Sequence, residues 1–347
     1  MIELDGSEGE GGGQILRTGL ALAMLAQRPL AIERIRAGRP KPGLMRQHLA
    51  CVQAAAAVCG ARVQGAELGA QALRFEPGPV RAGAYRFAIA GAGSCLLVLQ
   101  TVLPALLLAD GPSTLHLSGG THNPWAPPFH FVERAFAPLV RRTGAGLDLT
   151  LHRHGFHPAG GGEVLATVTP PAGVLQPFDL MARGELREAW ADCLAPGLPR
   201  RIAARELAVF GEATRWAPEQ LRHGGARQDE GPGNALMATL VHEHATEVFM
   251  ALGEKSLPSE QVARRLLGEM RAFQARPAAA VGPHLADQLA LLLALAVWRS
   301  GRPARFSCSQ ATPHLRTQCA VIPRVLPVTA AIDEAGPVPV VRLAPAG

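Results

Sequence analysis

The sequence predicts an α/β (α+β) protein with three repeated sheet-and-helix units and a smaller inserted α/β domain. Three segments share one form, a glycine-containing turn that leads into a leucine- and alanine-rich helix: residues 11–26, 91–109 and 282–298. Each is followed by a strand-like segment, a polar loop and a second helix, which indicates an internal repeat. With 347 residues, 48% of them hydrophobic, the chain can bury a large core.

The spacing of these turns locates the insertion. Gly13 and Gly93 are 80 residues apart, whereas Gly93 and Gly282 are 189 residues apart, so the second interval is longer by 109 residues. A domain of ordinary size fits in that difference. We therefore expect the first two units in residues 1–182, the inserted domain in 183–276 and the third unit in 277–347.

The remaining elements are assigned in chain order. After its first helix, the first unit is expected to contain a strand at 30–36, a helix at 44–60 and closing strands at 73–76 and 85–89. The second unit is expected to contain strands at 113–117, 147–152 and 164–169 and a helix at 129–143. The third unit is expected to contain a strand at 304–308 and a helix at 314–325. The inserted domain is expected to contain strands at 185–191, 206–210, 235–241 and 246–250 and a helix at 259–274.

The charge composition favours a polyanionic partner. The formal net charge is +6, and all but two of the 34 basic residues are arginines, the exceptions being Lys41 and Lys255. Arginine binds phosphate with two parallel hydrogen bonds, although biased codon usage would also raise its frequency. No apolar run reaches the ~20 residues of a membrane span. The six cysteines show no Cys-x-x-Cys spacing and the chain starts without a secretion signal, so we expect a cytoplasmic protein with reduced core thiols.

The first glycine loop, residues 5–17, has the composition of an anion or metal site. It contains five glycines, Glu8 and Glu10, and it leads directly into a helix. Bare backbone N–H groups and a helix N-terminus attract anions, and carboxylates suit a hard cation. The loop matches neither the Walker pattern nor the dinucleotide fingerprint, because no Gly-Lys-Ser/Thr follows and Gln14 replaces the third glycine. A solvated turn is the alternative interpretation.

Several segments together resemble the RNA 3′-terminal phosphate cyclases. They are residues 9–17, 35–44 with 46–48, 87–94 with 99–101, 118–121, 154–162 and 229–234. The resemblance covers nearly the whole chain and is distributed over many segments. It implies three repeats similar to the C-terminal domain of translation initiation factor three and a smaller inserted domain, in agreement with the repeat seen above.

The resemblance also implies an activity and a site. Family members use ATP to convert an RNA 3′-terminal phosphate into a 2′,3′-cyclic phosphodiester through a covalent histidine-AMP and an RNA-adenylate. His314 aligns with the nucleophile, with Asp287 expected to orient its ring, and Glu10 aligns with the carboxylate that binds Mg²⁺ or Mn²⁺. The implied nucleotide and phosphate contacts are Gln14, Arg17, Arg36, Arg39, Gln47, His48, Gln100, Pro127, His284, Asp287 and Gln288. For Arg36 and Arg39 the alternative is an exposed basic loop, and for His48 and Gln100 a polar group within a helix.

Some residues depart from the family pattern. His284 stands where bacterial members carry Tyr beside the adenine, His122 where Asp is common, and Gln318 where Asn is common. Imidazole stacks less extensively than phenol, which bears on the preference for ATP over GTP. A metal site in the histidine-rich stretch is disfavoured, since the spacings match no compact zinc pattern.

Two other functions fit parts of the sequence. A noncatalytic cyclase-like protein that binds RNA or assists ribosome assembly would need the same fold, but such relatives lack the nucleophilic histidine. An enolpyruvyl transferase would need lysine-rich anion sites, and this chain has two lysines. The residues specify neither the physiological RNA nor the oligomeric state.

Overall fold

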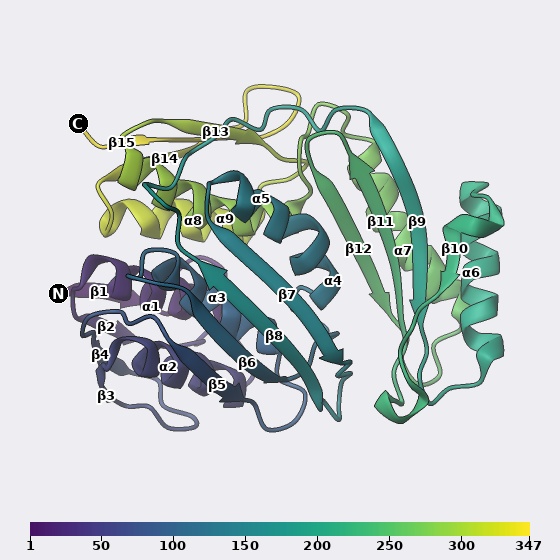
Figure 1. Cartoon of the computed structure of the whole chain (residues 1–347), viewed down its shortest axis with the longest axis horizontal. Helices are drawn as coiled ribbons and strands as arrows, with labels where there is room; N and C mark the ends of the chain where they lie inside the picture. The colour runs from purple at the N-terminus through teal and green to yellow at the C-terminus, as the bar shows by residue number, and fades with distance from the viewer.

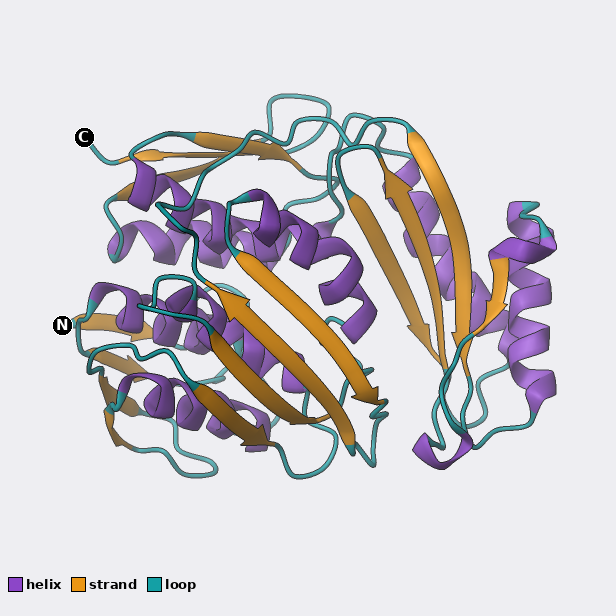
Figure 2. Cartoon of the chain, viewed as in Figure 1, coloured by secondary structure: helices purple, strands orange, loops and turns teal.

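The computed structural model describes residues 1–347 and contains four sheets covered by helices, which confirms the predicted α/β (α+β) class (Figures 1 and 2). The first unit consists of β1 (Ile2–Asp5), α1 (Gln14–Ala26), β2 (Leu30–Glu33), α2 (Arg46–Cys59), β3 (Arg62–Gln64) and β4 (Leu73–Glu76). Its strand order is β1-β2-β4-β3, with β1 parallel to β2 and the other pairs antiparallel. Apolar residues alternate along the strands and recur with helical period in α1, so both elements bury one face in a shared core.

The second unit repeats this topology. It consists of β5 (Ala84–Ala88), α3 (Cys95–Leu106), β6 (Ser113–Gly119), α4 (Phe129–Phe131), the π-helical turn η1 (Val132–Phe136), α5 (Ala137–Arg142), β7 (Gly146–Arg153) and β8 (Gly162–Thr169). The strand order is β5-β6-β8-β7, with β5 parallel to β6. The prediction that β5 closes the first unit was therefore wrong. An alternating strand pattern shows which face is buried but does not identify the neighbouring strand.

The third unit has a shorter sheet. It consists of α8 (Pro283–Ser300), β13 (Ala304–Ser307), α9 (Pro313–Val321), the 3₁₀ turn η4 (Ile322–Arg324), β14 (Val328–Asp333) and β15 (Val340–Pro345), in the order β13-β15-β14. Two isolated parallel bridges, Leu180 with Phe306 and Val281 with Cys308, occupy the place that β1 and β5 hold in the other units. The first strand of this unit is thus interrupted, and the inserted chain leaves and returns at the interruption.

The inserted region forms the fourth sheet, drawn at the right of Figure 1. It consists of β9 (Leu186–Leu194), α6 (Arg200–Thr214), η2 (Pro218–Gln220), β10 (Leu221–His223), η3 (Gln228–Glu230), β11 (Ala235–His242), β12 (Thr246–Leu252) and α7 (Ser259–Gln274), with strand order β10-β9-β11-β12. The strand predicted at 206–210 was wrong, because those residues lie in α6. Ala203, Glu206, Leu207 and Phe210 are buried at helical spacing, a period that a five-residue window does not resolve.

Two hydrophobic cores support the proposed division of the chain. A cluster that includes Phe210, Leu236 and Phe273 lies within the inserted region, separate from the larger cluster shared by the three units. Ala245 and Val248 near β12 belong to the larger cluster, so the inserted region also packs against the units. We propose 183–276 as the inserted domain on this basis. All six cysteines are buried and unpaired, and no helix has the length and apolar composition of a membrane span.

The larger core brings helices of all three units together. α1 contacts α3 and α9, and α8 contacts α3 and α9. In Figure 1 α1, α8 and α9 lie beside the central sheet and α3 lies behind it. Glycine turns precede α1, α3 and α8 and a polar loop precedes α9, so the repeat directs these loops and the polar side chains beside them toward one region.

A buried carboxyl connects the inserted domain to α8. Glu247 of β12 accepts a 2.5 Å hydrogen bond from the N–H of Gly282, the residue that precedes α8. Burial raises the pKa of Glu247 to about 8, while the Gly282 N–H and the charge of Arg183 act in the opposite direction. The folded chain therefore holds a proton here at pH values where an unfolded chain does not.

This burial predicts a pH-dependent stability. Because the pKa of Glu247 rises from 4.5 in the unfolded chain to about 8 in the folded chain, its contribution to stability falls as pH rises through that window. Glu247→Gln retains an acceptor for Gly282 without the charge. We expect the unfolding midpoint of the wild type to fall more than that of the Gln variant between pH 5 and 8, as measured by urea unfolding. Equal changes in both proteins would contradict this prediction.

Candidate functional site

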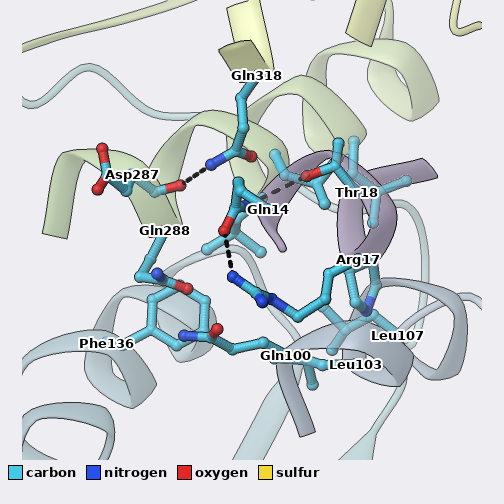
Figure 3. A pocket seen from close by; sticks show the side chains of 14 residues that line it. Gln14, Arg17, Thr18, Gln100, Leu103, Leu107, Phe136, Asp287, Gln288 and Gln318 are labelled. Carbon is cyan, nitrogen blue, oxygen red and sulfur yellow. Dashed lines mark hydrogen bonds between the residues drawn. The ribbon is translucent and has the colours of Figure 1, made fainter. Parts of the chain in front are cut away.

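A pocket lies where α1, α3, α8 and α9 meet. Figure 3 shows five polar side chains pointing into it from four helices: Gln14 and Arg17 from α1, Gln100 from α3, Gln288 from α8 and Gln318 from α9. Apolar side chains form the remaining wall, namely Leu103, Pro104, Leu107, Phe136, Leu291, Leu292 and Leu295. An apolar pocket with a few convergent polar groups is the usual form of a small-molecule site.

Hydrogen bonds fix most of these polar groups. Arg17 donates from Nη2 to Gln14 Oε1 at 2.7 Å, and Gln14 donates from Nε2 to Thr18 Oγ1 at 3.2 Å. Gln100 and Gln288 make no side-chain hydrogen bond, and the Nε2 of Gln100 is buried without a partner. A buried donor without a partner costs about 1–3 kcal/mol, so this amide is suited to a ligand that accepts a hydrogen bond.

Glu10 lies at the centre of the first glycine loop and is nearly inaccessible, with 5% of its side chain exposed. Its Oε2 pairs with Arg39, and its Oε1 accepts a 2.9 Å hydrogen bond from the N–H of Gln14. Burial acts to raise the pKa of Glu10, but the Gln14 N–H and the Arg39 guanidinium outweigh it and lower the pKa overall. The carboxylate is therefore ionised at neutral pH.

His314 lies in the first turn of α9, beside Glu10. Its Nδ1 is 3.9 Å from Glu10 Oε1 and is buried without a hydrogen-bond partner, while 41% of the side chain is exposed. Burial lowers the pKa of His314, as do the charges of Arg17 and Arg39, whereas Glu10 acts to raise it. At neutral pH the ring is thus uncharged, with Nδ1 enclosed on the Glu10 side and Nε2 toward the open side.

Thr312 holds the helix that carries His314. Its Oγ1 accepts a 2.9 Å hydrogen bond from the N–H of Leu315, which caps α9, and donates to the carboxyl of Asp287. Asp287 therefore bonds Thr312 rather than the His314 ring, and it positions the histidine through the helix end. Burial raises the pKa of Asp287 to about 7, although the Thr312 hydroxyl acts to lower it.

Cations and a neutral imidazole surround the glycine loop. Arg36 donates from Nη1 to the carbonyls of Lys41 and Gly43 at 2.5 and 3.0 Å. Burial, together with the charges of Arg17 and Arg36, lowers the pKa of His48 to about 3, so its ring is neutral. A Cβ at Gly13 would lie 2.5 Å from His48 Nε2 and 2.9 Å from Arg17 Nη1, so a larger residue there would displace both side chains.

The structure brings most of the predicted site residues together. Glu10, Gln14, Arg17, Arg36, Arg39, His48, Gln100, Asp287, Gln288 and His314 line the pocket or surround the glycine loop. His284 lies in the first turn of α8, where desolvation of the ring by the surrounding site and the charge of His314 lower its pKa. Gln47 lies farther along, accepting a 2.9 Å hydrogen bond from the N–H of Ser94 in the second glycine loop. No hydrogen bond or pocket contact joins Pro127 to this group.

Two threonines of the site were not predicted. Thr312 caps α9, and Thr317 Oγ1 accepts a 3.3 Å hydrogen bond from the N–H of Glu10. The Thr-Pro pair before His314 is a recognisable helix start and identifies Thr312 as a cap from sequence alone. The contact of Thr317 joins residues 307 positions apart and leaves no local signal.

The protein alone does not supply a complete metal cage. No three or more His, Cys, Asp or Glu side chains are grouped closely enough to hold a metal ion. Mg²⁺ commonly binds through one or two carboxylates together with phosphates of the substrate. Glu10, ionised and next to a loop of bare N–H groups, fits that kind of shared site.

The amino-acid sequence matches the family model described as RNA 3'-terminal phosphate cyclase over residues 8–332. The chain is 53% identical over 350 residues to an RNA 3'-terminal phosphate cyclase of Ralstonia nicotianae, covering 99% of this chain and 96% of that protein. It is 50% and 49% identical to proteins of the same name from Salmonella agona and Salmonella paratyphi C, each match covering 96% of this chain and 95% of the relative.

The proximity of Glu10 and His314 predicts a measurable electrostatic coupling. Removing the carboxylate charge removes the one influence that raises the pKa of His314, so Glu10→Gln is expected to lower that pKa further below 6.5. NMR titration of the imidazole resonances measures the change. Glu8→Gln is the matched control, because Glu8 is 41% exposed and pairs with Arg324. A His314 pKa that is the same in both variants would contradict the geometry.

Proposed function

This chain belongs to the RNA 3′-terminal phosphate cyclase family, and we propose that it uses ATP to convert the 3′-terminal phosphate of RNA into a 2′,3′-cyclic phosphodiester. The observation that carries the proposal is the position of His314. Its ring is neutral, lies beside Glu10 and adjoins a pocket lined by glutamines and Arg17. These are the groups that a nucleotidyl transfer to histidine requires.

The chemistry explains why ATP is needed. A terminal phosphate monoester is a poor electrophile, because its displacement by a neighbouring hydroxyl would expel an oxide. Joining AMP to that phosphate creates a phosphoanhydride with a good leaving group. The enzyme therefore has to carry AMP from ATP to the RNA.

In the first step, His314 Nε2 attacks the α-phosphorus of ATP. The nitrogen–phosphorus bond forms, the bond from the α-phosphorus to the bridging oxygen breaks, and pyrophosphate leaves. The lowered pKa of His314 keeps the nitrogen lone pair available at neutral pH. Arg17, Arg36 and Arg39 are suited to stabilising the negative charge on the phosphates.

In the second step, an oxygen of the RNA 3′-phosphate attacks the same phosphorus, the bond to His314 breaks, and RNA-adenylate forms. In the third step, the vicinal 2′-oxygen attacks the terminal phosphorus, the cyclic ester closes and AMP leaves with the electron pair of the broken bond. The proton of the 2′-hydroxyl is released in that step. Both later steps need the same electrostatic stabilisation, so one cationic site serves all three.

Glu10 would hold a divalent cation, Mg²⁺ or Mn²⁺, together with phosphate oxygens of the nucleotide. Such an ion, when bound, neutralises charge on the phosphates that react. The carboxylate carries its negative charge at neutral pH because Gln14 N–H and Arg39 lower its pKa against the effect of burial. Arg39 also pairs with the Glu10 carboxylate, and it would donate some of its hydrogen bonds to phosphate oxygens when the nucleotide binds.

The pocket beside His314 has a volume of about 40 Å³, less than a nucleoside needs, so it would have to widen to hold the nucleoside part of ATP. Gln100, with its unpartnered amide, and Gln288 offer hydrogen bonds, and Gln14, Gln47, His48, Pro127 and Asp287 complete the contacts expected from the family. His284, in place of the Tyr of bacterial members, would stack on the base with a smaller ring.

Two features bear on the alternatives. The retained His314 and its neutral ring favour an enzyme over a noncatalytic RNA-binding or ribosome-assembly protein. Six buried, unpaired cysteines support the proposed cytoplasmic location, where thiols stay reduced.

Labelling with ATP tests the proposal directly. Incubation with α-labelled ATP and Mg²⁺ is expected to leave an acid-labile, base-stable label on the wild type, detected after denaturing electrophoresis. His314→Ala and His314→Asn are expected to lose it completely, because no nitrogen nucleophile remains at that position. Circular dichroism checks that both variants stay folded. Label on either variant, or none on the wild type, would overturn the enzyme assignment.

Substitutions of two neighbouring glutamates distinguish the loss of a metal ligand from a general change in charge. Glu10→Ala is expected to reduce the rate of metal-dependent labelling by a factor of about 100 or more, because an ionised carboxylate near the phosphates is lost. Glu8→Ala is expected to change the rate less than about threefold, since Glu8 is exposed and paired with Arg324. Titration with Mn²⁺ distinguishes weaker metal binding from a slower chemical step. Equal losses in the two variants would remove Glu10 from the metal site.

A further inference from the structure

Trp125 presents almost its whole side chain to solvent. It lies in the loop between β6 and α4 and is 99% exposed, whereas the other exposed large hydrophobic residues range from 43% to 59%. The three other tryptophans, Trp190, Trp216 and Trp298, are each partly buried. An exposed tryptophan gives up the stabilisation that a large aromatic ring gains by burial, so its position calls for an explanation.

The residues before Trp125 are firmly anchored. Thr121, His122 and Asn123 are buried. His122 bonds Thr121 Oγ1 at 2.9 Å through Nδ1 and His130 Nδ1 at 3.0 Å through Nε2, and Asn123 donates to the carbonyl of Ala92. The indole is therefore attached to a fixed base.

The loop also restricts the backbone at and after Trp125. Trp125 itself has φ of +64°, a left-handed conformation that costs free energy for any residue other than glycine. Pro124, Pro127 and Pro128 fix φ around it, and the N–H of Phe129 closes the loop on the carbonyl of Thr121 at 3.0 Å. The backbone that carries the indole is held by a rigid segment, so little backbone entropy is lost when the indole binds a ligand.

The anchor also locates Trp125 near the candidate site. Ala92, the partner of Asn123, belongs to the second glycine loop, and Ser94 in the same loop donates to Gln47. Gln47 adjoins His48, which lies against Gly13 and Arg17. Two residues span at most about 7 Å, so Trp125 lies within about that distance of Asn123, on the side of the candidate site that the second glycine loop forms.

We propose that Trp125 is a stacking platform for a base at the 3′ end of single-stranded RNA, within the last three nucleotides. This inference rests on the proposed function, because it concerns how the RNA 3′-phosphate is brought to the site. Every base has a π-face, so an exposed indole holds RNA without reading its sequence. The net charge of +6 and the arginines around the glycine loop hold the phosphates, and Trp125 adds a contact to the base.

Substitutions at Trp125 separate stacking from other contributions. Trp125→Phe keeps a ring, Trp125→Leu keeps an apolar side chain without one, and Trp125→Ala removes both. We expect the KM for a 3′-phosphorylated oligoribonucleotide to rise about tenfold in the Leu and Ala variants and to stay within about threefold in the Phe variant, with kcat changed little. Formation of the histidine-AMP in the absence of RNA is expected to keep its wild-type rate.

Abasic substrates locate the base. Three oligoribonucleotides are compared, each lacking the base at a different one of the last three positions. Only one of the three is expected to have a higher KM than the intact oligoribonucleotide with the wild-type protein. In Trp125→Ala the same substrate is expected to give no further rise, because the partner of that base is already gone. A wild-type KM in the Ala variant, or an equal abasic effect in both proteins, would overturn the inference.

Fluorescence separates this inference from the proposed function. With His314→Asn as the background, RNA binding is expected to quench the emission of Trp125, and the additional Trp125→Phe substitution removes that change. Quenching without any cyclase activity in the wild type would retain the platform and reject the proposed function. Cyclase activity with an unquenched Trp125 would do the reverse. A change in molecular mass on Trp125→Ala, measured by light scattering, together with unchanged RNA binding, would assign the residue to self-association instead.

Discussion

The candidate site depends on the close approach of the first glycine loop to α9, which joins the first unit to the third. Glu10 N–H donates to Thr317 Oγ1 at 3.3 Å, and a Cβ on Gly9 would lie 2.0 Å from that same oxygen. Gly9 also has φ of +63°, so glycine is required there for both space and conformation. Without this approach Glu10 and His314 would not meet, since they are carried by different units.

The ionisable side chains of the site are buried, but they do not all lose their charge, and this difference determines what the site can do chemically. Glu10 keeps its charge because a backbone N–H and Arg39 compensate for burial, whereas burial, reinforced by nearby arginines, leaves His48 and His314 uncharged. The same environment therefore holds an ionised carboxylate and an uncharged imidazole close together, as the proposed metal binding and nucleophilic attack require. Asp287 takes part indirectly, through Thr312 and the end of α9.

The sequence predicts the elements that recur in each unit and the elements whose ends are marked by local sequence signals. The three glycine turns and their helices are visible from composition and period, and the helix at Ser259–Gln274 is predicted to the residue. The sequence does not predict the pairing of β5 with β6, because this pairing depends on a partner strand that is distant in the chain. It also does not predict the helix at 206–210, because the helical period becomes visible only over a longer stretch of sequence. The site residues follow from family resemblance, whereas their hydrogen bonds depend on tertiary packing.

The position of the inserted domain implies a link to the candidate pocket. The insertion interrupts the strand formed by Leu180 and Val281, and Val281 is followed directly by Gly282, the residue that precedes α8. Glu247 of the inserted domain accepts the hydrogen bond of Gly282, while Asp287 and Gln288 on the following turns line the pocket. A movement of β12 relative to the three units would therefore act on the start of α8, as well as on α4 and η1, which also contact β12. Because packed helices shift as rigid bodies, such a displacement would reach the side chains that line the pocket.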